Sequence, residues 1–135
     1  MTPWFADTYF FIALLSDKDL AHKESLDILE NLKSQILTTE WVLTELADAM
    51  SCSHDRHRCL SLISFLQAHP LVEILPVTHD GFEEGLRLYG SRSDKAWSLT
   101  DCTSFSVMKR YGLREALTGD HHFEQAGFTA LLRQK

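Results

Sequence analysis

The chain has 135 residues, of which 44% are hydrophobic and 24% charged, and we predict one soluble globular domain over residues 1–135. The formal net charge of −6 argues against a general nucleic-acid binder that relies on a basic surface. No apolar run approaches the ~18–20 residues that span a bilayer, and no basic segment precedes the N-terminal apolar stretch, so we predict a cytoplasmic protein with no signal peptide and no membrane partner.

Short apolar runs alternate with helical patterns in the N-terminal part of the chain. Residues 3–7 predict a buried strand, and residues 8–15, apolar nearly throughout, predict a short helix packed on both sides. Apolar residues at helical spacing predict an amphipathic helix over residues 20–32. A second short apolar piece follows at 35–38, and the stripe after it predicts a helix over 40–50.

Prolines and polar clusters divide the rest of the chain. Residues 71–75 form the clearest predicted strand, which is β-branched and closed by Pro76, and Pro70 ends the helix before it. Leu60, Ile63 and Leu66 are expected on the buried side of that helix, with Cys59 as a further candidate. The remaining predictions are helices over 55–69, 78–89 and 98–111, a polar loop at 90–96, a strand at 116–118, a helical turn at 120–125, and a last short strand after residues 127–128.

Capping residues mark several helix ends. Short polar side chains favour the N-cap position, where they accept backbone N–H groups, and glycine favours the position after a helix. The candidate N-caps are Asp17 or Asp19, Thr38 or Thr39, Asp55, Thr78 or Asp80, and Ser98 or Thr100, with Gly112 as the candidate C-cap.

The alternation of short strands with helices of ten or more residues indicates an α/β fold with a parallel sheet. Ligands of such sheets bind outside the carboxyl ends of the strands. Asp7 and Asp120 each follow a predicted strand, so each is expected at a carboxyl end. Glu45 falls beside the apolar stripe of its helix, and Asp101 lies near the start of an apolar helix, where burial would penalise an unpaired carboxylate.

Each of these four acids also has a structural explanation. Asp7 could cap the helix that follows it, Asp101 could be a first-turn acid that favours the helix dipole, and Asp120 could be a turn or N-cap residue. Glu45 could extend from its helix to water. If instead the four converge, their mutual repulsion calls for a hard cation, and oxygen ligands suit Mg²⁺ or Mn²⁺. Such ions activate water at phosphodiesters, which predicts a hydrolytic metallonuclease.

Four segments in order resemble the PIN-domain ribonucleases, and the toxins of VapBC toxin–antitoxin pairs are the closest subgroup. The segments are Phe5-Ala6-Asp7-Thr8, Thr44-Glu45-Leu46, Ser98-Leu99-Thr100-Asp101-Cys102, and Leu117-Thr118-Gly119-Asp120 with Phe123 and Gly127-Phe128. The resemblance implies a three-layer sandwich with a central parallel sheet and helices on both faces. It also implies Mg²⁺- or Mn²⁺-dependent RNA cleavage by Asp7, Glu45, Asp101 and Asp120, with Thr8 and Thr118 as supporting residues.

The resemblance further implies a homodimer and, for toxins, an antitoxin whose C-terminal segment lies across the active-site groove. Basic residues are fewer here than in many relatives, and the candidates near the groove are Arg92, Lys95, Lys109, Arg110 and Arg114. Two other functions remain open from the residues: a PIN-like binding module that no longer cuts, and a metal-dependent DNA nuclease or phosphatase.

The remaining reactive side chains show no second motif. Cys52, Cys59 and Cys102 lack zinc or redox spacing and are expected as reduced thiols. The seven histidines form no HExxH pattern, and no P-loop is present. His54 and His57 are expected to be structural or on the surface. His121 and His122 adjoin Asp120, so one of the two could contact substrate.

Overall fold

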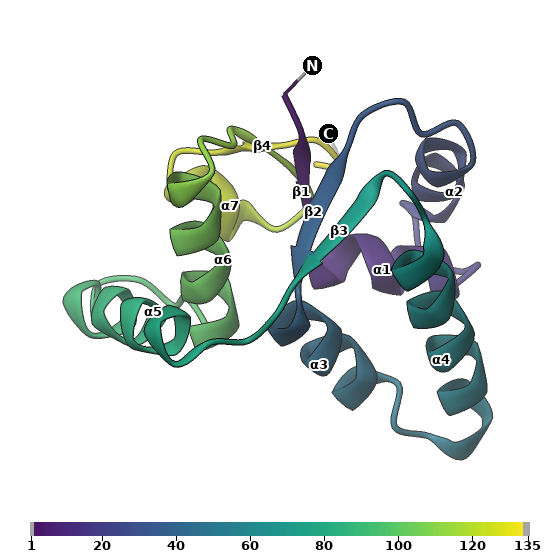
Figure 1. The fold of residues 1–135 in the computed structure, drawn as a ribbon, viewed down its shortest axis with the longest axis horizontal. Coiled ribbons are helices and arrows are strands. Elements are labelled where there is room, and N and C mark those ends of the chain that lie inside the picture. Colours follow the sequence, from purple (N-terminus) through teal and green to yellow (C-terminus); the bar gives the residue numbers. More distant parts are fainter. Residues whose placement is uncertain (1, 134–135) are drawn as a thin grey trace.

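The computed structural model describes residues 2–133 and contains a five-stranded parallel sheet (Figure 1). The strands run in the order β3-β2-β1-β4-β5, and every neighbouring pair is parallel. The predicted parallel α/β sheet is therefore confirmed. Its strands are β1 (Trp4–Ala6), β2 (Ile36–Thr39), β3 (Val72–Leu75), β4 (Glu115–Leu117) and β5 (Thr129–Ala130).

Helices flank the sheet on both sides, which confirms the three-layer arrangement. In Figure 1, α6 and α7 lie on one side of the strands, while α1, α2 and α4 lie on the other. The helices are α1 (Thr8–Leu15), α2 (His22–Glu30), α3 (Glu40–Ala49), α4 (Ser53–Ala68), α5 (His79–Ser91), α6 (Leu99–Arg110) and α7 (His121–Gln125). None of the helices within residues 2–133 is long and apolar enough to cross a membrane.

The strand order places a topological switch point at β1. The chain passes from β1 to β2 and β3 on one side, and later returns to β4 and β5 on the other. Phe5 pairs in register with Leu37 of β2 and with Ala116 of β4. The connections that leave β1 and β4 therefore diverge from adjacent strand ends, which is where open α/β sheets hold their ligands.

Aromatic side chains fill the core between the sheet and its helices. Phe5, Phe10, Phe11 and Phe123 are fully buried. The rings of Phe105 and Phe123 meet edge to face with centroids 4.9 Å apart, which aligns the positive edge of one ring with the negative face of the other. This cluster ties α6 and α7 to the centre of the sheet and so holds the strand ends in fixed positions.

Most predicted helix ends are confirmed by capping hydrogen bonds. The hydroxyls of Thr39 and Thr78 accept the N–H groups of Val42 and Gly81 at 3.1 and 3.0 Å, and Ser98 caps α6. Gly112 follows α6 with φ +68°, a left-handed conformation that glycine adopts without a Cβ penalty.

Four local predictions are wrong. Neither Asp17 nor Asp19 caps α2, because the N-cap of that helix is Ala21, which makes no side-chain capping hydrogen bond. Asp55 does not cap α4, because the helix already begins at Ser53 and Asp55 lies in its first turn. Leu20 is not helical and is 85% exposed, since the chain turns through Asp19 and enters α2 only at His22. Leu60, expected on the buried side of α4, is 64% exposed, because the residues that contact the core from that helix are Cys59 and Leu66.

Candidate metal centre

The four predicted carboxylates line one open cleft of about 410 Å³ at the carboxyl edge of the sheet. They come from the ends of β1 and β4, from the middle of α3 and from the first turn of α6. The structure thus brings together residues that lie up to 113 positions apart in the sequence, as Asp7 and Asp120 show. The other residues along the cleft are Thr8, Tyr9, Ile12, Ala49, Ala96, Ser98 and His122.

Asp7 is the most deeply buried of the four acids, with 4% of its surface exposed. It is the residue before α1, yet its side chain makes no capping hydrogen bond, so the helix-cap explanation fails. The Thr118 hydroxyl donates to Asp7 Oδ2 at 2.9 Å. Burial raises the pKa of Asp7 to about 7, with the charges of Asp101 and Glu45 adding to the rise, while Thr118 and the Thr8 N–H oppose it.

Glu45 faces the cleft from the middle of α3 and is half-buried. Its carboxylate accepts a hydrogen bond from the Thr8 hydroxyl, with 2.5 Å between Thr8 Oγ1 and Glu45 Oε1. Val42 and Leu46, which share the same side of the helix, are fully buried. Packing of these neighbours and the Thr8 hydrogen bond together hold the carboxylate toward the cleft instead of letting it swing into open water.

Asp101 serves the helix and the cleft at once. Its Oδ2 accepts the Ser98 N–H at 3.1 Å while the Ser98 hydroxyl accepts the Asp101 N–H at 2.9 Å, which forms a capping box. The first-turn explanation is therefore correct, but the residue is also only 8% exposed and lines the cleft. Burial raises the pKa of Asp101, the nearby Asp120 raises it further, and hydrogen bonds from Ser98 and His122 lower it.

Asp120 is the N-cap of α7, where its Oδ1 accepts the His122 N–H at 2.9 Å. The capping explanation is again correct, and the residue faces the cleft as well. The Thr118 hydroxyl joins the two ends of the site, because it accepts the Asp120 N–H at 3.1 Å and donates to Asp7. Thr118 is itself fully buried, so this link is shielded from water.

The charges around the cleft are not balanced by basic side chains. Across residues 2–133, no lysine or arginine lines it. Arg92 makes a bidentate pair with Asp94 and stacks on Trp97, while Arg110 pairs with Glu84. The predicted scarcity of basic residues is thus most pronounced at the cleft itself, where the carboxylates form hydrogen bonds with hydroxyls, backbone N–H groups and one imidazole.

This arrangement fits a divalent cation. Asp7 is held near two other carboxylates with neutral hydrogen-bond donors alone, and its pKa is raised first by burial and then by the charges of Asp101 and Glu45. A cation would remove the repulsion, and a site rich in carboxylate oxygens suits Mg²⁺ or Mn²⁺. Among residues 2–133, the one group of three metal-ligating side chains with all ligand atoms within 4.8 Å is Asp120, His121 and His122.

Tyr9 is a cleft residue that was not singled out in the sequence. Tyr9 lines the cleft two residues after Asp7, and a Cβ on Gly119 would approach its ring to within 2.5 Å. The close approach of Tyr9 therefore requires glycine at position 119. The glycine itself was the sequence signal that another group lies close to the backbone there. Ser98 was predicted as a helix start, but its position beside the cleft depends on the fold.

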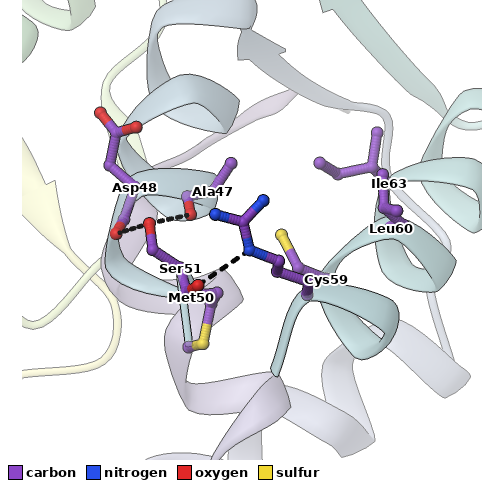
Figure 2. Close-up of a pocket in the computed structure, with 8 residues that line it drawn as sticks. Ala47, Asp48, Met50, Ser51, Cys59, Leu60 and Ile63 are labelled. Atoms are coloured by element: carbon purple, nitrogen blue, oxygen red, sulfur yellow. Dashed lines mark hydrogen bonds between the residues drawn. The ribbon is translucent and has the colours of Figure 1, made fainter. Parts of the chain in front are cut away.

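A second hollow of about 300 Å³ lies between α3 and α4 (Figure 2). Its walls are mostly apolar, from Met50, Cys59 and Ile63, and Asp48 is its one acidic residue. Arg56 also lines it and donates from Nε to the Ser51 carbonyl at 2.8 Å. This α3–α4 pocket contains none of the four predicted carboxylates.

The sequence matches the family described as PIN domain over residues 5–129. The 23S rRNA-specific endonuclease VapC20 of Mycobacterium tuberculosis is 27% identical over 126 residues, which cover 92% of this chain and 94% of that protein. The PIN-domain match spans the positions of all four carboxylates, and the roles considered for them rest on the geometry above.

Solved structures share the fold. The crystal structure of Mycobacterium tuberculosis VapC20, described as a Sarcin-Ricin loop cleaving toxin, matches with a TM-score of 0.84 at 24% identity, over 94% of this chain and 97% of that chain. VapBC2 from Rickettsia felis, bound to a promoter DNA fragment, matches at 0.66 with 14% identity, over 95% and 96% of the two chains. FitAcB from Neisseria gonorrhoeae matches at 0.64 with 18% identity, over 93% and 94%.

Proposed function

The chain belongs to the PIN domain family, a family of metal-dependent nucleases, and we propose that it is an endoribonuclease whose active site is the acidic cleft. The observation that carries this proposal is the convergence of Asp7, Glu45, Asp101 and Asp120 without a lysine or arginine among the residues that line the cleft. The proposed cofactor is Mg²⁺ or Mn²⁺, and the proposed acting unit is one domain over residues 1–135.

The four carboxylates would hold the divalent ion, which supplies activation of water and charge stabilisation at a phosphodiester. The chain's own contribution is to keep the ligands in place. Thr118 orients Asp7 through its hydroxyl and fixes the Asp120 backbone, and Thr8 orients Glu45. Such supporting contacts keep ligating groups in position and tune their basicity.

The named activity of a relative supports RNA as the substrate class. VapC20 is named as a 23S rRNA-specific endonuclease, and it covers nearly the whole chain. An acidic protein can hold a polyanion where bound cations reverse the local charge. The same relatives support a cytoplasmic setting for this chain.

Protein partners form the next part of the proposal. The VapBC complex among the structural neighbours supports an antitoxin partner, and we propose that this partner covers the active site. A homodimer is supported by Phe82, Leu86 and Tyr89, which follow helical spacing along α5 and are 40 to 52% exposed.

The test is cleavage of RNA in Mn²⁺ or Mg²⁺ by the wild type and by Asp101→Asn, with Asp48→Asn as the matched control. Asp48 is an exposed acid on α3 that lines the α3–α4 pocket. We expect Asp101→Asn to lose on the order of 10³-fold in rate, since a ligand to the ion is removed, and Asp48→Asn to match the wild type.

Two outcomes would overturn the proposal. Equal cleavage by Asp101→Asn, or cleavage that persists in a chelator, would place the chemistry elsewhere. Side-by-side digestion of single-stranded RNA, single-stranded DNA, a DNA flap and a phosphate monoester would identify a DNA nuclease or a phosphatase. Absence of Mn²⁺ binding by calorimetry, together with no cleavage, would instead indicate a binding module.

A further inference from the structure

We propose that His122 is a nitrogen ligand of the ion in the acidic cleft, and that its imidazole makes the site prefer a transition-metal ion such as Mn²⁺ over Mg²⁺. This inference rests on the proposed function and extends it. It adds one residue to the four carboxylates and assigns the class of ion.

The position of His122 Nδ1 between two carboxylates carries the proposal. Nδ1 lies 3.2 Å from Asp101 Oδ2 and 3.4 Å from Asp120 Oδ1. Ligand atoms that are each 2.0–2.1 Å from one ion stand roughly 2.8–3.0 Å apart in octahedral and 3.3–3.4 Å apart in tetrahedral coordination. His122 Nδ1 is therefore close to the spacing of a neighbouring ligand from each of the two carboxylate oxygens.

The local fold holds the imidazole in this place. Asp120 caps α7 by accepting the His122 N–H, so the backbone of His122 is attached to one of the two carboxylates that its ring faces. The His122 side chain is 20% exposed and lines the cleft, while the Asp101 side chain is 10% exposed. The imidazole is thus held beside both carboxylates before any ion binds.

His121 offers a matched comparison on the same helix. Its Nδ1 is 3.6 Å from Asp120 Oδ1, but its side chain is 55% exposed and it is not among the residues that line the cleft. Both histidines belong to the group whose ligand atoms lie within 4.8 Å of one another. The contact with Asp101 distinguishes His122, because that contact connects the imidazole to the second wall of the cleft.

The chemical consequence is a choice of ion. Mg²⁺ prefers oxygen ligands and retains water, whereas imidazole ligands suit first-row transition ions. A site of carboxylates alone would accept Mg²⁺ well. Replacing one oxygen by the His122 nitrogen favours Mn²⁺ or a later ion of that row.

The experiment uses the full chain loaded with Mn²⁺ and examined by pulsed electron paramagnetic resonance, with natural-abundance or ¹⁵N-labelled histidine. We expect a ¹⁴N coupling in the wild type that ¹⁵N-histidine replaces, that is lost in His122→Asn and that is retained in His121→Asn. In calorimetry, His122→Asn should weaken Mn²⁺ binding by roughly 10–100-fold and Mg²⁺ binding much less, with His121→Asn close to the wild type.

The outcomes separate this inference from the proposed function. Mn²⁺ that binds and supports RNA cleavage without any nitrogen coupling would overturn the ligand role of His122 and leave the nuclease intact. Coupling that survives in His122→Asn, or disappears in His121→Asn, would also overturn it. If the wild type binds no Mn²⁺, this inference fails, and if it also cleaves no RNA in Mg²⁺, the proposed function fails with it. Because the isotope test uses the wild type, it does not depend on the folding of a variant.

Discussion

Helix α3 separates two hollows of similar size that differ in their charge. Glu45 and Ala49 face the acidic cleft, while Ala47, Asp48 and Met50 face the α3–α4 pocket. The cleft collects four carboxylates and no lysine or arginine, whereas the pocket combines apolar walls with one acid and one arginine (Figure 2). Uncompensated charge, and not the volume of the hollow, therefore distinguishes the candidate site.

The difference extends to how each hollow is built. The cleft lies at the ends of β1 and β4, where buried threonines fix the acids through hydrogen bonds. The pocket lies between two helices on the surface. Within residues 2–133, the one hydrogen bond described for the Arg56 side chain is to a backbone carbonyl. A bound ion or a neutral substitution can relieve the repulsion between carboxylates at the cleft. We therefore expect such changes to alter stability strongly at the cleft and weakly at the pocket.

The largest expected effect is on stability in the metal-free protein at neutral pH. The pKa of Asp7 is about 7 in the folded state against 3.8 for the ordinary side chain. A raised carboxyl pKa means that the folded state binds the proton more tightly, so stability is greatest below about pH 4 and falls as pH rises to 7. We expect Asp7→Asn to be more stable than the wild type by up to about 4 kcal/mol at pH 8.

The measurement is urea unfolding in a chelator at pH 4 and pH 8. The advantage of Asp7→Asn should be small at pH 4, where Asp7 is protonated in the folded state and about half protonated in the unfolded state. An advantage that is equal at both pH values would show that Asp7 carries no buried charge. Asp48→Asn, on the pocket side of α3, should show no such dependence.

A smaller effect is expected from metal binding. An ion that binds only the folded state at 100 times its Kd stabilises by about 2.7 kcal/mol, which corresponds to roughly 10 °C in Tm for a chain of this size. We expect this shift with Mn²⁺ for the wild type and for Arg56→Ala, and its loss in Asp101→Asn. An equal shift in Asp101→Asn, measured by thermal unfolding, would place the ion outside the cleft.

The smallest expected effect is a difference in stability cost between substitutions at two buried threonines at strand ends. Thr118 donates to the Asp7 carboxylate, and Thr38 donates to the Ala6 carbonyl at 2.8 Å. Either change to valine should cost about 1–2 kcal/mol. Thr118→Val should also raise the pKa of Asp7, so its cost should grow from pH 4 to pH 8, while the cost of Thr38→Val should stay constant. Parallel pH profiles of the two variants in urea unfolding would contradict this account.

Much of the local structure was predictable from the sequence. Thr39, Thr78, Ser98 and Gly112 mark helix ends through interactions within four residues of the chain. The wrong predictions concern the starts of α2 and α4 and the exposure of Leu60. Leu60 sits on an apolar helix face that meets the α3–α4 pocket instead of the core, and no local pattern distinguishes these two surroundings.

The candidate site likewise combines features that the sequence predicted with a contact that it did not. The four acids were identified in order, with the capping roles of Asp101 and Asp120 left as alternatives, and both alternatives proved compatible with a place at the cleft. The contact of His122 with Asp101 was not predictable, because it joins the start of α6 to α7 across the cleft.

The sequence by itself determined the alternation of strands and helices and the presence of acids beside strand and helix ends, because side-chain periodicity and capping act over a few residues. The tertiary structure alone decided that β1 stands between β2 and β4. That order results from the packing of the whole core, and it brings Asp7 to Thr118 and both to Asp120. Four acids that repel one another are neighbours because the burial of the aromatic core outweighs their repulsion.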